Sequence, residues 1–331
     1  MDGTRDLQVV TVGEALIDFV ATCPGRLQDV FAFNRLPGGA AANVAVGLAR
    51  LGIRVGMIGK VGQDEFGFFL RRELEKEKVD TRGLLFSKDA RTTLAFVSLT
   101  EDGERGFLFY RHPGADEQLC PGDIDESLIA DSYVLHLSSL SLTSEPARSA
   151  ALRAMRLARR HDLLVTFDPN LRPSLWRSER DMKTVTREIM RVCDVVKLSA
   201  SEVQALAEAE NVEEGSLRLV QSGVSLVIVT LAGKGCHYRT RTRVGNVEGY
   251  EVVVKDTTGA GDGFLAGFLA YIVRHGLVYA LHELGTKELE KALQYANAVG
   301  AMVVTGLGAI SSLPCDAAVS KFLTQQEQGN R

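Results

Sequence analysis

Short apolar runs alternate with longer stretches of helical periodicity along most of the 331-residue chain. The apolar runs predict buried strands, and they lie at 9–12, 55–58, 133–137, 163–167, 195–198 and 226–231. The stretches between them predict helices at 42–51, 65–77, 145–160, 180–192 and 201–207. Strands that alternate with helices are typical of a mostly parallel sheet with helices on both faces, so the pattern predicts an α/β fold.

Two segments interrupt this alternation. Residues 24–37 look extended, and residues 92–111 read as two extended runs around a polar turn at 101–104, which is typical of a β-hairpin. We expect lid segments at about 22–37 and 92–112, which together form a small β flap that projects from the sheet over a cleft. An edge decoration or a dimer contact is the alternative interpretation.

Composition and charge place the chain among ordinary soluble globular proteins, with 45% apolar and 24% charged residues. The net charge of −4 gives no reason to expect a nucleic-acid partner, because nucleic-acid binders carry basic patches. The best basic run, formed by Arg239, Arg241 and Arg243, is expected along one face of a strand. No internal repeat or low-complexity linker divides the chain, so 1–331 is expected to form a single domain.

Cysteine usage and hydropathy bear on location. The five cysteines are scattered without a CxxC pair, which argues against a disulfide framework or a zinc site and favours a reducing compartment. The N-terminus lacks the anatomy of a signal peptide. The longest stretch without charge, 292–315, contains polar residues and glycines, so it is expected to be a buried helix plus a loop. We therefore expect a cytoplasmic protein without a membrane span.

The segment Asp256-Thr-Thr-Gly-Ala-Gly-Asp262 carries the strongest chemical signal. Its small residues let backbone N–H groups converge, and they precede an apolar run, 263–273, that predicts a helix. A helix N-terminus offers unpaired N–H donors and a partial positive charge, which suit an anion. A carboxylate there, Asp262, suits a base for a hydroxyl that attacks a phosphoryl group. Ordinary N-capping explains the segment equally well when it is taken alone.

A second small-residue patch, Pro37-Gly38-Gly39-Ala-Ala-Ala-Asn43, also opens a predicted helix. Two such patches, more than two hundred positions apart, suggest two faces of one cleft. The chain has no GxxxxGK(S/T) phosphate loop and no GxGxxG after its first strand, and it lacks the HExxH and GxSxG signatures. The sequence therefore favours a phosphotransferase centre that does not use a Walker-type loop.

The two patches resemble the two signatures of the ribokinase (phosphofructokinase-B type) family of carbohydrate kinases, and the likeness covers essentially the whole chain. Within that family the chain is most similar to the fructokinases. Four further segments carry this likeness: Gly13-Glu-Ala-Leu-Ile-Asp18-Phe, Ala90-Arg-Thr-Thr-Leu-Ala-Phe-Val, Phe109-Tyr-Arg-His-Pro-Gly-Ala-Asp116 and Phe167-Asp-Pro-Asn-Leu-Arg172. The resemblance implies a ribokinase-like fold and the ATP-dependent phosphorylation of D-fructose to fructose 6-phosphate.

The resemblance also implies roles for individual residues. Asp262 would take the proton of the attacking hydroxyl, while the N–H groups of Gly259, Ala260 and Gly261 would form an anion hole. The implied substrate ligands are Asp18, Gly38, Gly39, Asn43, Arg111 and Arg172. The implied nucleotide contacts are Ser199, Thr230, Gly233, Gly235 and Asn297, whereas Lys234 is expected to face solvent.

Metal ions follow from the same resemblance. Glu202 would organise Mg²⁺ through water molecules. Many family members carry Asn-x-x-Glu at this place, and here Ser199 replaces the asparagine. A monovalent cation, K⁺, would lie beside the anion hole, mostly held by backbone carbonyl groups. The residues around it would be Asp256, Thr258, Val303, Gly306, Gly308 and Ser312.

Other functions stay open from the sequence. A 2-keto-3-deoxygluconate kinase shares the DPNLR segment and an arginine at the position of Arg111, and other sugar kinases of the family are more distant. A non-catalytic family member that acts as a scaffold or regulator would be expected to lose Asp262 or the glycines of the anion hole, which this chain retains. Besides sugar and ATP, the expected partner is a second copy of the chain that binds through the flap.

Overall fold

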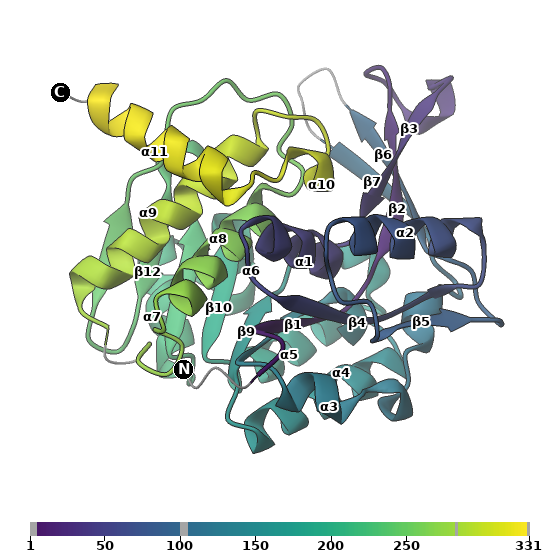
Figure 1. The fold of residues 1–331 in the computed structure, drawn as a ribbon, viewed down its shortest axis with the longest axis horizontal. Helices are drawn as coiled ribbons and strands as arrows, with labels where there is room; N and C mark the ends of the chain where they lie inside the picture. Colours follow the sequence, from purple (N-terminus) through teal and green to yellow (C-terminus); the bar gives the residue numbers. More distant parts are fainter. Residues whose placement is uncertain (1–4, 100–104, 282–283, 330–331) are drawn as a thin grey trace.

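The computed structural model describes residues 5–99, 105–281 and 284–329. Nine strands in this part of the chain form one sheet, in the order β13-β12-β11-β10-β9-β8-β1-β4-β5 (Figure 1). Neighbouring strands are parallel from β11 to β5, whereas β12 and β13 add an antiparallel hairpin at one edge. The strands are β1 (Val9–Val12), β4 (Val55–Gly62), β5 (Leu84–Ser87), β8 (Val134–Ser138), β9 (Leu164–Asp168), β10 (Val195–Ser199), β11 (Leu226–Thr230), β12 (Cys236–Arg239) and β13 (Val244–Val247).

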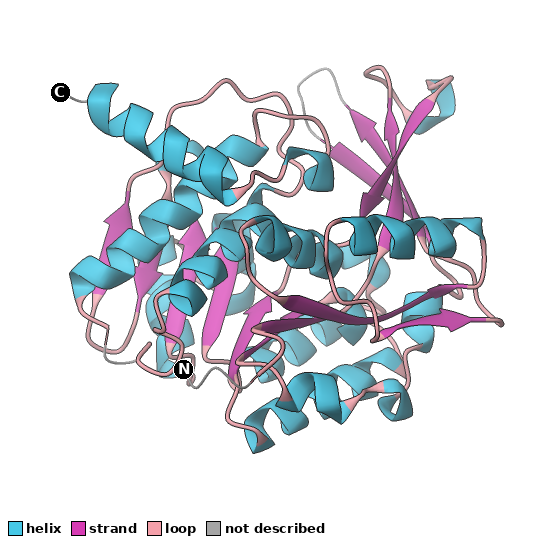
Figure 2. Ribbon diagram, viewed as in Figure 1, coloured by secondary structure: helices cyan, strands magenta, loops and turns pink. Residues whose placement is uncertain are grey.

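Helices cover both faces of this sheet (Figure 2). One face carries α1 (Ala40–Arg50), α2 (Glu65–Lys76), α8 (Ala260–Arg274), α9 (Thr286–Val303), α10 (Ala309–Ser312) and α11 (Asp316–Gly329). The other carries α3 (Glu126–Ala130), α4 (Ala147–Arg160), α5 (Glu179–Met190), α6 (Ala200–Ala207) and α7 (Val212–Gln221). Short 3-10 helices are η1 (Leu27–Asp29), η2 (Ala115–Gln118), η3 (Pro121–Asp123), η4 (Leu140–Leu142), η5 (Pro173–Leu175) and η6 (Ala232–Lys234).

Alternate residues of the central strands pack into two separate cores. In β1, Val9 belongs to the core under α1 and α8, whereas Val10 and Val12 belong to the core under α4. A strand that is buried on both faces is apolar at most of its positions, which is why the central strands read as nearly continuous apolar runs. The predicted α/β fold with a mostly parallel sheet is confirmed.

A second, four-stranded sheet forms the flap, in the order β3-β2-β6-β7 (Figure 1). Its strands are β2 (Leu16–Ala21), β3 (Phe33–Gly38), β6 (Leu94–Leu99) and β7 (Arg105–Tyr110). The predicted flap is therefore present, and the structure adds β2, which pairs with β3 and β6 and connects the two predicted segments. The expected turn at 101–104 lies outside the described residues.

Two further expectations have a clear outcome. The basic run does not follow a strand face: Arg239 ends β12 and Arg243 precedes β13, so Arg241 lies in the turn between the strands. Charged residues suit this turn because β12 ends before it, β13 begins after it, and the backbone between them faces water. The uncharged stretch 292–315 contains the second half of α9 and a loop that leads to α10, as expected. In the described part of the chain, no helix combines the length and apolarity needed to cross a membrane.

Candidate active site

A cavity of about 450 Å³ lies at the carboxyl edge of the parallel strands, which is where open α/β sheets bind ligands. The ends of β9 and β10 and the first turns of α1 and α8 form its floor and walls, and β2 and β7 of the flap contribute one side. The predicted site residues that line it are Asp18, Gly39, Asn43, Arg172, Ser199, Glu202, Thr230, Thr258, Gly259, Gly261 and Asp262. The two glycine patches thus face one cavity, as the sequence suggests.

The start of α8 leaves backbone donors open to the cavity. Gly259 precedes the helix with φ 77°, and a Cβ on it would lie 2.5 Å from the Cβ of Ala309, so only glycine fits there. The N–H of Ala260 donates to the carbonyl oxygen of Thr257 at 3.3 Å. Within the described residues the N–H groups of Gly259 and Gly261 have no hydrogen-bond partner. Two open donors at a helix N-terminus form a site for an anion.

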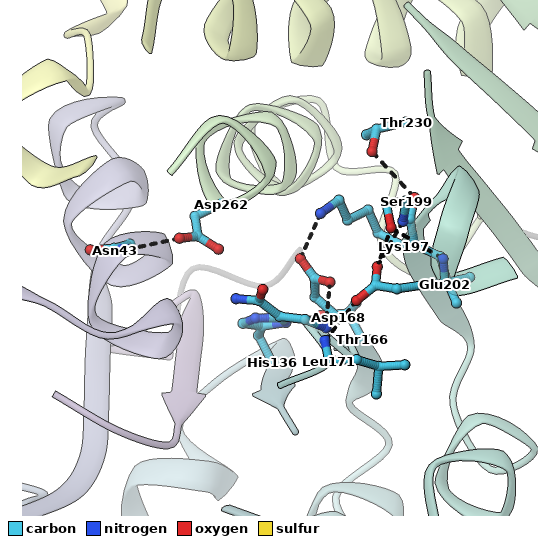
Figure 3. Close-up of polar contacts among 12 residues, drawn as sticks. Asn43, His136, Thr166, Asp168, Leu171, Lys197, Ser199, Glu202, Thr230 and Asp262 are labelled. Atoms are coloured by element: carbon cyan, nitrogen blue, oxygen red, sulfur yellow. Dashed lines mark hydrogen bonds and ion pairs between the residues drawn. The ribbon is translucent and has the colours of Figure 1, made fainter. Parts of the chain in front are cut away.

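Asp262, in the first turn of α8, is a buried carboxylate of raised basicity. Its Oδ2 accepts a hydrogen bond of 2.7 Å from Nδ2 of Asn43, across the cavity on α1 (Figure 3). Burial, and after it the negative charge of Asp168, raises the pKa of Asp262 to about 6, although Asn43, Lys197 and Arg172 act in the opposite direction. The group is therefore ionised near neutral pH and still binds a proton readily, which suits a general base.

A buried ion pair lies beside this carboxylate. Nζ of Lys197, on β10, is 2.8 Å from Oδ2 of Asp168, which ends β9 (Figure 3). Both side chains line the cavity and are 7% and 3% exposed. Sequence reasoning singled out neither residue, although both are charged residues near the carboxyl ends of otherwise apolar strands. That pattern is the signal that could have found them.

Glu202 connects two segments of the cavity wall. Its Oε2 accepts hydrogen bonds from the N–H and the hydroxyl of Ser199, at 2.8 and 2.9 Å, in a capping box that opens α6. Its Oε1 accepts from the N–H of Leu171 at 2.7 Å. Glu202 therefore fixes the loop that carries Arg172 against the end of β10 (Figure 3). Thr230, at the end of β11, lies next to this group, and its hydroxyl donates to the carbonyl oxygen of Leu198 at 3.3 Å.

The opposite end of the cavity is built by the flap and the first turn of α1. A Cβ on Gly38 would overlap the carboxylate of Asp18, so a glycine is needed at this position. Asp18 lines the cavity, whereas Gly38 does not. Gly39 has φ 103°, and a Cβ there would lie 2.5 Å from the carbonyl oxygen of Glu14. Arg172 places its guanidinium 5.0 Å from the ring centre of Phe107, on the flap. The flap and the main sheet thus share the lining of one cavity.

Glu14 is a cavity residue that sequence reasoning missed. Its Oε1 accepts from the N–H of Ala40 at 2.7 Å, and its Oε2 accepts from the hydroxyl of Ser138 at 2.8 Å. Burial raises the pKa of Glu14 despite these hydrogen bonds. The carboxyl group therefore supplies the hydrogen-bond acceptor at the start of α1, where Gly39 offers no side-chain cap.

Comparisons with known proteins bear on this geometry. The profile of the pfkB family carbohydrate kinases matches residues 6–316. The chain belongs to the pfkB family of carbohydrate kinases. Fructokinase-1 of Oryza sativa subsp. japonica is 43% identical to it over 325 residues, which are 98% of this chain and 99% of that protein. As a pfkB family member, the chain is a phosphotransferase that acts on a sugar hydroxyl.

Solved structures of similar proteins give the same picture. A fructokinase with bound ATP from Xylella fastidiosa matches with a TM-score of 0.89 and 35% identity, over 96% of this chain and 99% of that one. A double-mutant fructokinase from Vibrio cholerae, in a form with fructose, ADP and potassium ion bound, matches with a TM-score of 0.85 and 34% identity, over 97% and 99%.

One residue that the family resemblance offers as a substrate ligand is turned away from the cavity. The side chain of Arg111 is fully buried and does not line the wall. Its Nε donates to Asp116 at 2.8 Å and its Nη1 to the hydroxyl of Thr143 at 2.7 Å, while Nη2 donates to the carbonyl oxygen of Leu140 at 2.9 Å. Asp116, five residues along the chain, compensates its charge, so the donors of Arg111 are taken up by acceptors of the protein and the side chain joins the flap to the main body.

Three nucleotide contacts implied by the family are also not among the residues that line the cavity. Nδ2 of Asn297, on α9, donates to the carbonyl oxygens of Val247 and Glu248 at 3.2 and 3.0 Å. Gly235 has φ 94°, and a Cβ on it would overlap the carbonyl oxygen of Val247. Gly233 itself is exposed with open space around it, but a Cβ on Gly249 would lie 2.5 Å from its carbonyl oxygen, so the backbone of Gly249 packs against it. These residues hold the loop after β13 in place, and Lys234 is exposed, as expected.

The residues implied to surround a monovalent cation lie together beside the start of α8. Asp256 Oδ1 accepts from the N–H of Thr258 and Oδ2 from the N–H of Gly308, each at 2.7 Å. The N–H of Gly306 donates to the carbonyl oxygen of Val303 at 3.2 Å, and a Cβ on Gly306 would overlap the hydroxyl of Ser312. The hydroxyls of Thr258 and Ser312 are buried without a hydrogen-bond partner in the described part of the chain. Such orphaned oxygens point to a ligand, and a cation fits them.

Proposed function

We propose that this family member is an ATP-dependent fructokinase that converts D-fructose to fructose 6-phosphate. One observation carries the proposal: Asp262, with its pKa raised to about 6, faces the cavity beside the open N–H groups at the start of α8. A base next to an anion site is what transfer of a phosphoryl group to a hydroxyl requires. The choice of fructose is supported by the rice fructokinase and by the Vibrio cholerae structure with fructose and ADP bound.

In the proposed step the oxygen of the sugar hydroxyl attacks the γ-phosphorus of ATP, and its proton moves to the carboxylate of Asp262. The bond from the γ-phosphorus to the bridging oxygen breaks, and ADP leaves with that electron pair. Charge on the phosphoryl oxygens is met by the N–H groups of Gly259 and Gly261. The N–H of Ala260 completes the anion hole, since its bond to Thr257 is long at 3.3 Å.

The sugar is proposed to bind between the flap and α1. Asp18 and Asn43 supply a carboxylate and an amide, which can bridge neighbouring hydroxyl groups. Gly39 leaves room for the sugar ring against the backbone, and Gly38 keeps the carboxylate of Asp18 in place. Arg172 lines the same cavity and can donate paired hydrogen bonds to sugar or phosphate oxygens.

The nucleotide is proposed to occupy the other end, past the edge of β10 and β11. Ser199 and Thr230 line the cavity there and offer hydroxyl groups. Gly233, Gly235 and Asn297 shape the adjoining wall by fixing the loop after β13, so their contribution to ATP binding is through the backbone they support.

Glu202 suits an indirect role toward Mg²⁺. Its carboxylate lines the cavity in a position fixed by Leu171 and Ser199, and it retains lone pairs for water molecules of a hydrated ion. When bound, Mg²⁺ would neutralise phosphate charge on ATP. The orphaned hydroxyls of Thr258 and Ser312 support a K⁺ site formed with Asp256, Val303, Gly306 and Gly308.

We also propose a homodimer that forms through the flap. Its outer face carries the stacked rings of Phe19 and Phe96, 5.1 Å apart, and the neighbouring side chains of Leu108 and Tyr110 are 48% and 62% exposed. Exposed apolar side chains of this size favour a protein partner. Free cysteines, of which Cys23, Cys120 and Cys315 are exposed, fit the cytoplasm as the proposed location.

The deciding experiment is a coupled ADP-release assay with Mg-ATP and fructose, glucose, ribose, adenosine or 2-keto-3-deoxygluconate, with and without potassium. Turnover confined to fructose is the expected result. A preference for the keto acid would replace the proposed substrate and would assign Arg172 to its carboxylate, since Arg111 does not reach the cavity. Folded protein that binds ATP and phosphorylates none of these compounds would instead support a scaffold or regulator.

A further inference from the structure

One buried cation of the cavity, Lys197, has no role in the phosphoryl transfer proposed above. Lys197 has three N–H donors, and one of them is directed to Asp168 at 2.8 Å. No second acceptor lies within hydrogen-bond distance of its Nζ among the residues that the structure describes. Two donors of a protonated amine therefore remain for a ligand, on a side chain that lines the cavity and is only 7% exposed.

The ammonium group lies against the anion site. A Cβ on Gly261 would overlap Nζ of Lys197, so the first turn of α8 and the tip of this side chain meet without a gap. Figure 3 shows Lys197 extending from β10 between α8 and Asp168, with its nitrogen on the side of Asp262. Gly261 and the ammonium group of Lys197 thus line the cavity as direct neighbours.

The charges that line the cavity favour a cationic side chain next to the phosphates of a bound nucleotide. Its lining contains five acidic residues, Glu14, Asp18, Asp168, Glu202 and Asp262, and two basic ones, Arg172 and Lys197. ATP is strongly anionic, so the acidic lining opposes its triphosphate unless cations lie close to it. Arg172 lies over Phe107 of the flap, whereas the ammonium group of Lys197 is in direct contact with the start of α8.

A purely structural ion pair is the weaker explanation. Removing two charges from water costs about as much as their attraction returns, and apolar residues of similar volume would fill the place at least as well. The pair is retained at the cavity wall, where one partner has open donors. Nearby acids keep Lys197 charged, because Asp168, Glu202 and Asp262 raise the pKa of its ammonium group above the ordinary value despite burial.

We propose that Lys197 is a further catalytic residue, which donates hydrogen bonds to the transferring phosphoryl group, and that Asp168 is the positioning residue that holds it. This inference rests on the proposed phosphoryl transfer. Lys197 keeps its proton throughout: the hydroxyl proton goes to Asp262, and the electron pair of the breaking P–O bond leaves with ADP. Its donors follow the phosphoryl oxygens from ATP to the sugar phosphate.

The test compares two nucleotides that differ by the proposed contact. Calorimetric affinities for the non-hydrolysable analogue AMP-PNP and for ADP, both with Mg²⁺ and fructose, are measured for wild type and Lys197→Met. AMP-PNP affinity is expected to fall by ~10-fold or more, as for loss of a charge-assisted hydrogen bond, and ADP affinity to change by less than ~3-fold. Equal changes for both nucleotides, or no change for either, would overturn the proposal.

Removal of Lys197 alone leaves Asp168 buried and unpaired, so the double variant Asp168→Asn with Lys197→Met is measured beside it. It is expected to show the same selective loss of AMP-PNP affinity in a stably folded protein. The matched control is Asp123→Asn with Lys60→Met, a partly buried pair elsewhere that does not line the cavity, and both affinities should match wild type. If wild type phosphorylates no sugar, the proposed function fails, whereas the ratio of affinities still decides the role of Lys197.

Discussion

The chain opens two helices with the same kind of glycine-rich turn, and the two turns have different partners. At the start of α1 the N–H of Ala40 donates to the carboxyl group of Glu14 at 2.7 Å. At the start of α8 the N–H groups of Gly259 and Gly261 have no partner in the described part of the chain. Both turns attract an anion through their backbone donors. The protein supplies the acceptor itself at α1 and leaves the place of an anionic ligand open at α8.

The acidic side chains at the two turns, Glu14 and Asp262, also differ in whether they bind the backbone of the helix start. Glu14 points at the backbone of α1 and is held there also by Ser138, so it acts as part of the frame. Asp262 belongs to the first turn of α8 and reaches across to Asn43 instead of capping its own helix. The backbone donors of a glycine-rich helix start are therefore open to an anionic ligand only when no carboxyl group of the protein already accepts from them.

The largest expected effect is a loss of turnover when the carboxylate at the start of α8 is removed. Asp262→Asn should lower the turnover number by ~10²-fold or more, the range for loss of a general base, while sugar affinity changes little. Glu14→Gln, the matched change at α1, should lower it by less than ~10-fold. Steady-state kinetics with fructose and calorimetric binding of fructose measure both. Near-normal turnover of Asp262→Asn in folded protein would show that another group takes the proton.

The same substitution should make the protein more stable. Asp262 has a pKa of 3.8 when unperturbed and about 6 in the folded protein, so ionising it above pH 6 destabilises the fold. The stability that protonation of Asp262 contributes is therefore present at low pH and is lost as the pH rises through this window. Asp262→Asn avoids that loss and should raise the free energy of unfolding at pH 8 by about 2–3 kcal/mol.

Urea denaturation of wild type and Asp262→Asn at pH 8 and pH 4 measures this gain. At pH 4 the folded wild type already carries most of the proton, so the difference should nearly vanish. An equal gain at both pH values would attribute the effect to packing and would remove the argument for a strained, buried charge.

Much of this architecture follows from the sequence, because apolar strands buried on both faces leave an unmistakable pattern. The run at 55–58 is the first half of β4 (Val55–Gly62), and the helix expected at 65–77 is α2 (Glu65–Lys76). The hairpin of β12 and β13 was not predicted. Its strands are only four residues long and mix buried with exposed positions, as His237 and Val244 illustrate.

The site was harder to predict, since its chemistry depends on pairs that are distant in the sequence. Lys197 and Asp168 are 29 positions apart and meet only because β9 and β10 are neighbours. Glu14 and Ala40 are likewise distant in the sequence and are brought together by the fold. Arg111 shows the opposite case: its side chain turns inward to Asp116, and no local pattern distinguishes such an arginine from one that faces the cavity.

A medium effect is expected at α1. Glu14→Ala leaves the N–H of Ala40 and the hydroxyl of Ser138 buried without their acceptor, which should cost about 1–3 kcal/mol of the free energy of unfolding. Glu14→Gln keeps an acceptor for Ala40 and should recover most of that loss. Urea denaturation of both variants at pH 7 measures the difference. If Glu14→Ala were fully stable but ~10²-fold slower, the α1 turn would belong to the chemistry and the distinction between the two turns would fail.

The smallest expected effect is on the pH dependence of kcat/KM, which distinguishes the carboxyl groups at the two turns. Because Asp262 must be ionised to accept the proton, kcat/KM for fructose should fall about tenfold per pH unit below a pKa near 6. Groups that face Asp262 set this value: Asp168 raises it, and Asn43, Lys197 and Arg172 lower it. Asp168→Asn should therefore move the acid limb to lower pH, whereas the residual activity of Asp262→Asn should lack this limb. The profile of Glu14→Gln should keep the wild-type position, because the carboxyl group at α1 is not the one that titrates in catalysis. A limb that followed Glu14 and ignored Asp168 would exchange the roles of the two turns.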